Sequence, residues 1–122
     1  MGSIAYKLSE ESRKKLLALF PPKFAAVRCD HITVVFGVAS DVDLPAPPEV
    51  LEVIGYATDE CGIECLVVAV DGNTKREDGS TFHITLSRGV ERKSVESNDV
   101  LKNGWTKLET PVAIEAVVAF DE

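Results

Sequence analysis

The sequence lacks the segments by which proteins are inserted into membranes or exported across them. No apolar run approaches the length that a helix needs to cross a bilayer, and the longest such runs are Cys65–Val70 and Ala116–Phe120. The first residues do not combine a basic stretch with an apolar one, so no signal peptide is expected. The length of 122 residues suffices for one hydrophobic core and not for two. We therefore expect a single cytoplasmic domain, residues 1–122, without a membrane partner.

Positive charge is also scarce. The chain carries 13 lysines and arginines against 20 aspartates and glutamates, which gives a net charge of −7. Proteins that bind nucleic acid irrespective of its sequence neutralise many phosphates with lysine and arginine, so this composition excludes a broad basic surface for long nucleic acids. A nucleic-acid ligand would have to be short, or held by a local basic patch such as Thr74–Glu77 or Ser87–Lys93.

Cysteine is too rare, and too irregularly spaced, for a disulfide framework or a zinc site. The three cysteines are Cys29, Cys61 and Cys65. An odd number without a secretion signal favours reduced thiols. Cys61 and Cys65 have no second pair at the spacing of a zinc ligand set. We expect no metal site and no cofactor.

One segment has the pattern of an amphipathic helix. Ser9 is suited to cap this helix, and Glu10 follows in the first turn, where negative charge is favourable. Leu16 and Phe20 lie one helical turn apart on its apolar side. Pro21 ends the helix, because proline cannot donate a helical hydrogen bond. This helix of about three turns is the only long one that the sequence predicts.

The remaining apolar segments follow the pattern of strands and predict an α+β fold dominated by antiparallel sheet. The expected strands are Ser3–Leu8, Phe24–Arg28, His31–Phe36, Val50–Ala57, Ile63–Val70, Phe82–Ser87 and Val112–Phe120. Polar, proline-containing or glycine-containing loops separate them at Asp41–Glu49 and Asp71–Ser80, and one further helical turn is expected near Ser97–Leu101.

The only two histidines of the chain stand in nearly the same four-residue motif. The two motifs are His31-Ile32-Thr33-Val34 and His83-Ile84-Thr85-Leu86. Because side chains alternate along a strand, the histidine and threonine of each motif share one face and the two apolar residues share the other. Strict alternation also puts Phe36 on the apolar face of the first strand. The apolar faces suit a core, so we expect the two histidines and the two threonines to surround one cleft.

Two facing imidazoles are suited to acid–base chemistry at neutral pH. One imidazole can be neutral and remove a proton while the other is charged and donates one. The hydrolysis of a phosphodiester needs both proton transfers, and threonine hydroxyls can donate hydrogen bonds to the phosphate oxygens. The sequence does not decide which histidine is the base and which is the acid.

Paired His-x-Thr-x motifs of this kind resemble those of the 2H phosphoesterases, which include RNA 2′,3′-cyclic phosphodiesterases. The order of a first strand, the helical segment Leu8–Phe20 and then His31 is also similar to small members of that family, as is the stretch Lys93–Asn98. The resemblance implies a two-lobed, pseudo-symmetric fold with the cleft between its lobes. It implies that His31 and His83 are the catalytic pair and that Thr33 and Thr85 bind phosphate.

The function that follows is a metal-independent phosphodiesterase that hydrolyses the 2′,3′-cyclic phosphate of RNA ends or small cyclic nucleotides. Arg88 and Arg92 follow the second motif and are candidates for holding the phosphate, and Asn98 is a candidate for binding the substrate. One alternative is a non-catalytic module that binds a nucleotide or RNA end in the same cleft. A second alternative is a metal-binding or structural protein with incidental histidines. The expected partner is an RNA end or a small nucleotide, and the expected state is a monomer.

Overall fold

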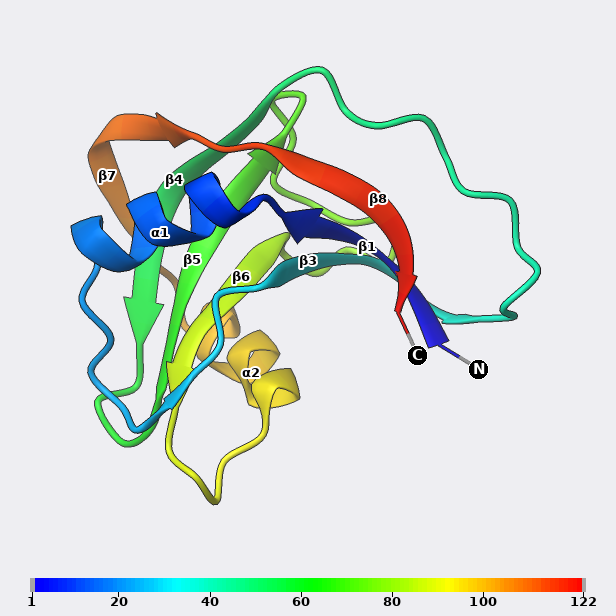
Figure 1. The fold of residues 1–122 in the computed structure, drawn as a ribbon. Coiled ribbons are helices and arrows are strands. Elements are labelled where there is room, and N and C mark those ends of the chain that lie inside the picture. The colour runs from blue at the N-terminus through cyan, green and yellow to red at the C-terminus, as the bar shows by residue number, and fades with distance from the viewer. Residues whose placement is uncertain (1, 122) are drawn as a thin grey trace.

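The computed structural model describes residues 2–121 and has an α+β architecture in which every strand pair is antiparallel (Figure 1). The elements in chain order are β1 (Gly2–Leu8), α1 (Glu10–Leu19), β2 (Ala26–Val27), β3 (His31–Val38), β4 (Leu51–Thr58), β5 (Ile63–Val70), β6 (His83–Arg88), the 3₁₀ turn Ser94–Glu96, α2 (Ser97–Lys102), β7 (Thr106–Ala113) and β8 (Ala116–Asp121). The predicted fold class is confirmed, and the second helix is short. None of the helices in the described part of the chain is long and apolar enough to span a membrane.

The strands form two sheets that place the two histidine motifs next to each other. The smaller sheet has the strand order β3-β1-β8, and the larger has the order β2-β6-β5-β4-β7. The first motif therefore begins an edge strand of the small sheet. The second motif begins β6, which only the two-residue β2 covers on its outer side. Strand β3 contacts β6, so the two sheets meet at the strands that carry the motifs (Figure 1).

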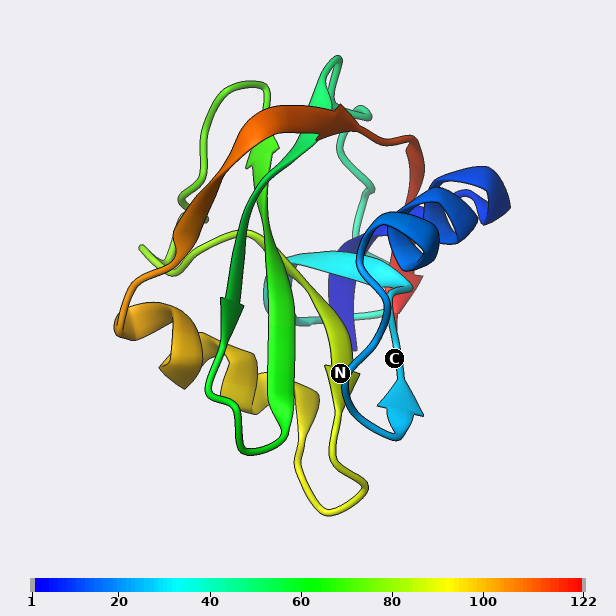
Figure 2. The same cartoon turned by 90° about the vertical axis from the view of Figure 1, so that its left-hand side faces the viewer.

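The two helices cover opposite faces of the larger sheet (Figure 2). Leu16 of α1 is fully buried in the main core, together with Val53 and Leu66 of the larger sheet and Ile32 of the smaller one. On the other face, Val100 and its neighbour on α2 pack against residues of β4 and β5. The main core thus lies between the two sheets and α1.

Helix α1 begins and ends where the sequence predicts. The Ser9 side chain accepts a hydrogen bond from the backbone N–H of Ser12 at 3.1 Å, which is the expected cap. The helix ends at Leu19, two residues before Pro21. Ser12 and Leu16 are its buried residues, so the predicted apolar side is the side that packs.

The predicted strand Val112–Phe120 is wrong, because the chain changes sheets within it. Strand β7 pairs with β4 in the larger sheet, and β8 pairs with β1 in the smaller one. Between them, the backbone N–H of Ile114 donates to Leu51, and that of Glu115 donates to the Ser12 side chain. The first half of β7 was missed because it is a largely exposed edge strand, and exposed strands carry no apolar alternation.

Candidate functional site

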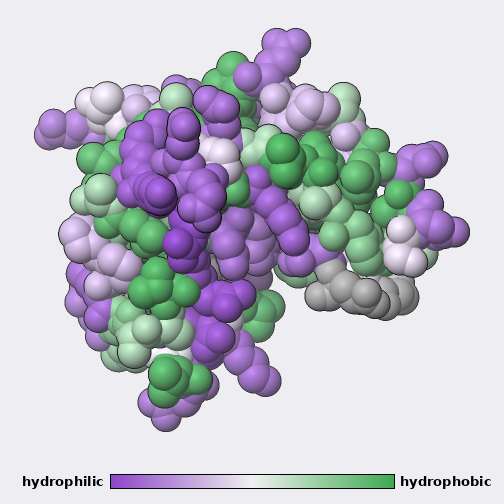
Figure 3. All heavy atoms as spheres, viewed as in Figure 1, coloured by the Kyte–Doolittle hydropathy of each residue, from purple (hydrophilic) through white to green (hydrophobic). Residues whose placement is uncertain are grey.

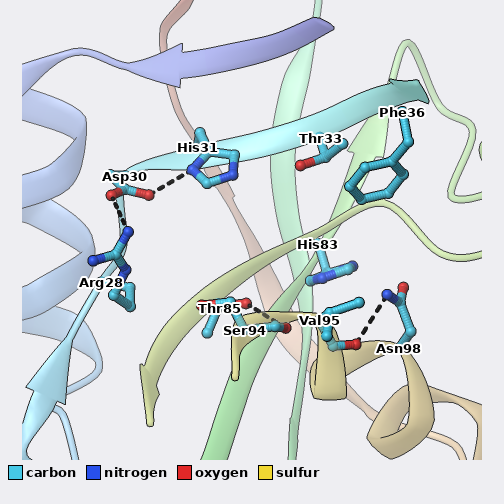
Figure 4. A pocket seen from close by; sticks show the side chains of 10 residues that line it. All are labelled: Arg28, Asp30, His31, Thr33, Phe36, His83, Thr85, Ser94, Val95 and Asn98. Carbon is cyan, nitrogen blue, oxygen red and sulfur yellow. Dashed lines mark hydrogen bonds and ion pairs between the residues drawn. The ribbon is translucent and has the colours of Figure 1, made fainter. Parts of the chain in front are cut away.

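A pocket of about 120 Å³ lies where β3 meets β6. The histidine and the threonine of each motif line it from the two strands, and the Ser94–Asn98 segment closes its lower side in Figure 4. The pocket is lined by Arg28, Asp30, His31, Thr33, Phe36, His83, Thr85, Ser94, Val95 and Asn98. Seen in space-filling form, the same face as in Figure 1 is hollowed between the two halves of the molecule, with hydrophilic residues bordering the hollow (Figure 3). The expectation that both histidines and both threonines surround one cleft is confirmed.

Three residues before the first motif carry the chain from one sheet to the other. The backbone N–H of Cys29 donates to the carbonyl of Thr85 at 2.8 Å, so this segment runs along β6. Cys29 has a φ of 59°, a left-handed conformation that few residues other than glycine adopt. Directly after it, the carbonyl of Asp30 accepts a hydrogen bond from Leu8 of the smaller sheet. The turn at Cys29 therefore sets His31 opposite the second motif.

His31 is held by a carboxylate. Its Nδ1 lies 2.6 Å from Asp30 Oδ1, and its Nε2 lies 4.0 Å from a carboxylate oxygen of Asp121. The hydrogen bond to His31 is the main reason why the pKa of Asp30 is lowered, and Arg28 at 3.5 Å contributes to the same effect. Because a carboxylate can only accept, Nδ1 carries a proton. The carboxylate fixes the tautomer and the orientation of the ring.

His83 has the opposite environment. Its Nδ1 lies 2.9 Å from the backbone carbonyl of Thr81, which also can only accept, so the proton is on Nδ1 and the lone pair of the neutral ring is on Nε2. Burial, with smaller contributions from the positive charges of Arg76 and His31, lowers the pKa of His83 to about 4, although the hydrogen bond to Thr81 acts in the opposite direction. His83 is therefore neutral at pH 7. The two histidines share a pocket but have different hydrogen-bond partners, a carboxylate for His31 and a backbone carbonyl for His83.

Thr85 and Asn98 form hydrogen bonds within the segment that follows β6. The Thr85 hydroxyl lies 2.9 Å from the Ser97 hydroxyl and 3.4 Å from the carbonyl of Ser94. Asn98 lines the pocket as expected, and its amide donates to the Val95 carbonyl at 3.1 Å. The 3₁₀ turn and the first turn of α2 thus form one wall of the pocket (Figure 4).

Two of the sequence-based candidates do not line the pocket. Arg88 turns its guanidinium to the backbone, with Nη1 donating to the carbonyl of Arg92 at 2.6 Å. Arg92 forms ion pairs with Asp59 at 2.7 Å and with Glu96 at 2.9 Å. Arg92 is already paired within the protein, and neither arginine lines the pocket, so the expectation that they hold the phosphate is not supported by their positions. Closeness in sequence to the second motif was a poor guide, because Arg88 is at an odd spacing from the histidine and the threonine of that motif along β6 and Arg92 lies in the loop after it.

Phe36 was assigned to the wrong face. Residue Ala5 of β1 pairs with Thr33, but the next residue, Ile4, pairs with Val35, so Val34 is an extra residue in β3. Such a bulge reverses the alternation that follows it. Phe36 consequently shares the face of Thr33 and lines the pocket, with 55% of its surface exposed.

Arg28 and Asp30 were not singled out from the sequence. They directly precede the first motif and line the pocket. The residue between them, Cys29, has a positive φ, and a cysteine in the sequence does not indicate such a conformation. Within the described residues, no group of three or more histidine, cysteine or acidic side chains could hold a metal ion.

Comparison of the chain with protein-family models, with curated protein sequences and with solved structures gives no match.

Proposed function

We propose that this protein is a metal-independent phosphodiesterase that opens the 2′,3′-cyclic phosphate of RNA ends or small nucleotides, as a member of the 2H phosphoesterases. The observation that carries the proposal is the pair of histidines in one pocket, one bound to a carboxylate and the other to a carbonyl. This arrangement supplies an acid and a base at the same pH, which phosphodiester hydrolysis requires.

The hydrogen bonds support one division of the two roles. His83 is the base: its Nε2 takes a proton from water as the water oxygen forms a bond to phosphorus. His31 is the acid: its Nδ1 proton is engaged with Asp30, so the proton on Nε2 passes to the ribose oxygen as the bond from phosphorus to that oxygen breaks. The product carries a phosphate monoester on one ribose oxygen and a free hydroxyl on the other. The transferred protons are then exchanged with solvent.

The negative charge of the phosphate is met by donors on both sides of the pocket. In this proposal the hydroxyls of Thr33 and Thr85, which line the pocket, donate to its non-bridging oxygens, and the Thr85 hydroxyl exchanges its contacts with Ser94 and Ser97 for the phosphate. Arg28, which is paired with the exposed Asp30, adds a positive charge. A pocket of about 120 Å³ is suited to the reacting phosphate rather than to a whole nucleotide. The exposed ring of Phe36 offers a face for a base that lies outside the pocket.

In the proposed two-lobed, pseudo-symmetric fold, each sheet is one lobe and contributes one histidine motif. Each motif strand pairs antiparallel with an inner strand of its sheet, β3 with β1 and β6 with β5. Each buries its isoleucine, and Ile32 and Ile84 are both fully buried. The lobes differ elsewhere, since the larger sheet has two more strands than the smaller one.

The test is an assay of the four nucleoside 2′,3′-cyclic monophosphates, and of a short RNA ending in a cyclic phosphate, with EDTA present. We expect hydrolysis of at least one of these substrates by the wild type and none by His83→Ala. Loss of activity in EDTA that Mg²⁺ or Mn²⁺ restores would contradict the metal-independent mechanism. Binding of these ligands without turnover would instead identify a non-catalytic module.

A further inference from the structure

Arg76 lies behind the pocket and joins three elements that surround it. It belongs to the loop before β6 and is only 4% exposed. Its guanidinium donates to the Ser80 hydroxyl at 2.7 Å, to the backbone carbonyl of Thr33 at 3.2 Å and to the Asn98 side chain at 2.8 Å. The same group lies 5.2 Å from the ring of Phe36. One side chain thus contacts its own loop, strand β3 and helix α2.

The charge of Arg76 is poorly neutralised. Within residues 2–121, Asp78 is the only carboxylate within 4.0 Å of the guanidinium; it lies 3.9 Å away and its side chain is 60% exposed. The three hydrogen-bond acceptors are uncharged. Burial lowers the pKa of Arg76, which expresses the cost of keeping a cation in this position. The three acceptors need donors spread around a planar group, which a guanidinium supplies, and its charge is brought with them into a buried position that Asp78 neutralises only weakly.

Arg76 is linked to the pocket of His83 through Thr33 and Asn98, which both line it. The other ionisable groups lining the pocket with His83 are His31 and Asp30 at the start of β3 and Arg28 just before them. Strand β5 contributes the apolar Val67 opposite His83, and α2 contributes the uncharged Asn98. Arg28 is paired with Asp30, whereas Arg76 is a permanent cation hydrogen-bonded to two residues that line the pocket, and a nearby positive charge opposes protonation of an imidazole.

We propose that Arg76 is a positioning residue for the acid–base pair, which fixes the spacing of the two motifs through its three hydrogen bonds and whose charge adds to burial in opposing protonation of His83. The inference rests on the proposed phosphodiesterase function for its effect on rate. Its effect on His83 holds whether or not the protein is an enzyme.

Two substitutions separate the geometric role from the electrostatic one. Arg76→Met keeps a long apolar stem but removes the charge and all three hydrogen bonds. Arg76→Lys keeps the charge, but an ammonium group cannot reach three acceptors arranged around a planar guanidinium. Lys75→Met is the matched control, because it removes one positive charge from the adjacent, exposed residue of the same loop.

The experiment is an NMR pH titration of the imidazole C–H signals, run alongside kinetics on a cyclic-phosphate substrate. With only two histidines, a His31→Ala spectrum assigns both signals. We expect the His83 midpoint to rise in Arg76→Met and to stay at the wild-type value in Arg76→Lys and Lys75→Met. We expect kcat to fall by about 10-fold or more in both Arg76 variants, as misplaced reacting groups do, and to be unchanged in Lys75→Met.

Either half of the proposal can fail by itself. A folded Arg76→Met with the wild-type His83 midpoint would overturn the electrostatic role, and an Arg76→Lys with wild-type kcat would overturn the geometric one. Should Arg76→Met not fold, Asp78→Asn replaces it: removal of this screening carboxylate must lower the His83 midpoint, and an unchanged midpoint overturns the electrostatic role. An inactive wild type in which the midpoints still shift as expected would refute the proposed function and retain the action of Arg76 on His83.

Discussion

His31 and His83 occupy the same place in two similar motifs but lie in different surroundings. Asp30 presents a charged oxygen to Nδ1 of His31, whereas the Thr81 carbonyl presents a neutral one to Nδ1 of His83. The second ring is also the more deeply buried, which favours its neutral form. Pairs of titratable groups whose surroundings favour opposite charge states are typical of acid–base catalysis.

Substitution of the two histidines should reduce activity more than substitution of the two threonines. His31→Ala and His83→Ala each remove a proton-transfer group and should lower kcat by at least about 10²-fold. Thr33→Ala and Thr85→Ala each remove a hydrogen bond to a charged oxygen, a loss of about 1.5–3 kcal/mol of transition-state stabilisation. None should unfold the protein, because Ile32 and Ile84 provide the packing of the two strands. A folded histidine variant with near-wild-type turnover would exclude the two-histidine mechanism.

The pH dependence of the rate should reflect the low pKa of His83. A base must be unprotonated, so activity should fall as the pH drops through about 4, the pKa of His83, rather than through the value of about 6.5 for a free imidazole. Initial rates between pH 3.5 and pH 9, checked for folding at each point, measure this limb. An acid limb centred near the free-imidazole value would assign the role of base elsewhere.

At the scale of elements, the sequence predicted those segments whose pattern is set by local burial. The helix after Ser9 and the strands around Ile32 and Ile84 were found because each has one apolar face and recognisable ends. Strand β7 was largely missed because an exposed edge strand has no such pattern. The face on which Phe36 lies was predicted wrongly, because the bulge in β3 depends on its pairing with β1 and the local sequence does not indicate how two strands pair.

The candidate site was likewise predicted only where a local pattern in the sequence revealed it. The repeated motif revealed both histidines and both threonines because repetition is visible in one chain. Arg76 could not be found in this way, because the loop that carries it is polar throughout and its contacts lie in β3 and α2. A residue that supports a site from another element has no characteristic spacing from the site residues, so the sequence alone does not identify it.

A close contact between β4 and the residue that precedes β7 gives a test of the larger sheet. A Cβ atom on Gly55 would lie 2.2 Å from Cε3 of Trp105, so Gly55→Ala must displace the indole ring. We expect a loss of about 1–3 kcal/mol in the free energy of unfolding, as for other overpacked sites. Urea unfolding followed by circular dichroism measures it.

A double-mutant cycle with Trp105→Ala is the control for this contact. With the indole removed, Gly55→Ala should be much less costly, because the clash has gone. An equal cost of Gly55→Ala in both backgrounds would show that the glycine is required for another reason, such as the irregular pairing of β4 between Val53 and Gly55.

For the whole molecule, the buried histidine makes folding stability depend on pH over a defined range. The pKa of His83 is about 4 in the folded protein and about 6.5 in an unfolded chain, so between these values the unfolded state binds more protons. The free energy of unfolding should therefore decrease as the pH falls from about 6.5 to about 4, and His83 causes no further change below that range.

Four carboxyl groups with a lowered pKa act in the same direction but at lower pH. These groups stabilise the fold above their unfolded pKa values, and the contribution is lost as the pH falls through their folded values. They are Asp30, Asp59, Asp78 and Glu96.

The difference between two variants isolates the contribution of His83. Urea unfolding at pH 7, 6 and 5, followed by the fluorescence of the single tryptophan, should show a progressive loss of stability in the wild type. In His83→Gln this loss should be much smaller, because the variant has no group at this position that must gain a proton on unfolding. In His31→Gln, which leaves His83 in place, a loss over this range should remain. The same decrease in His83→Gln as in the wild type would mean that His83 is not held neutral by the fold, and its assignment as the base would lose its physical ground.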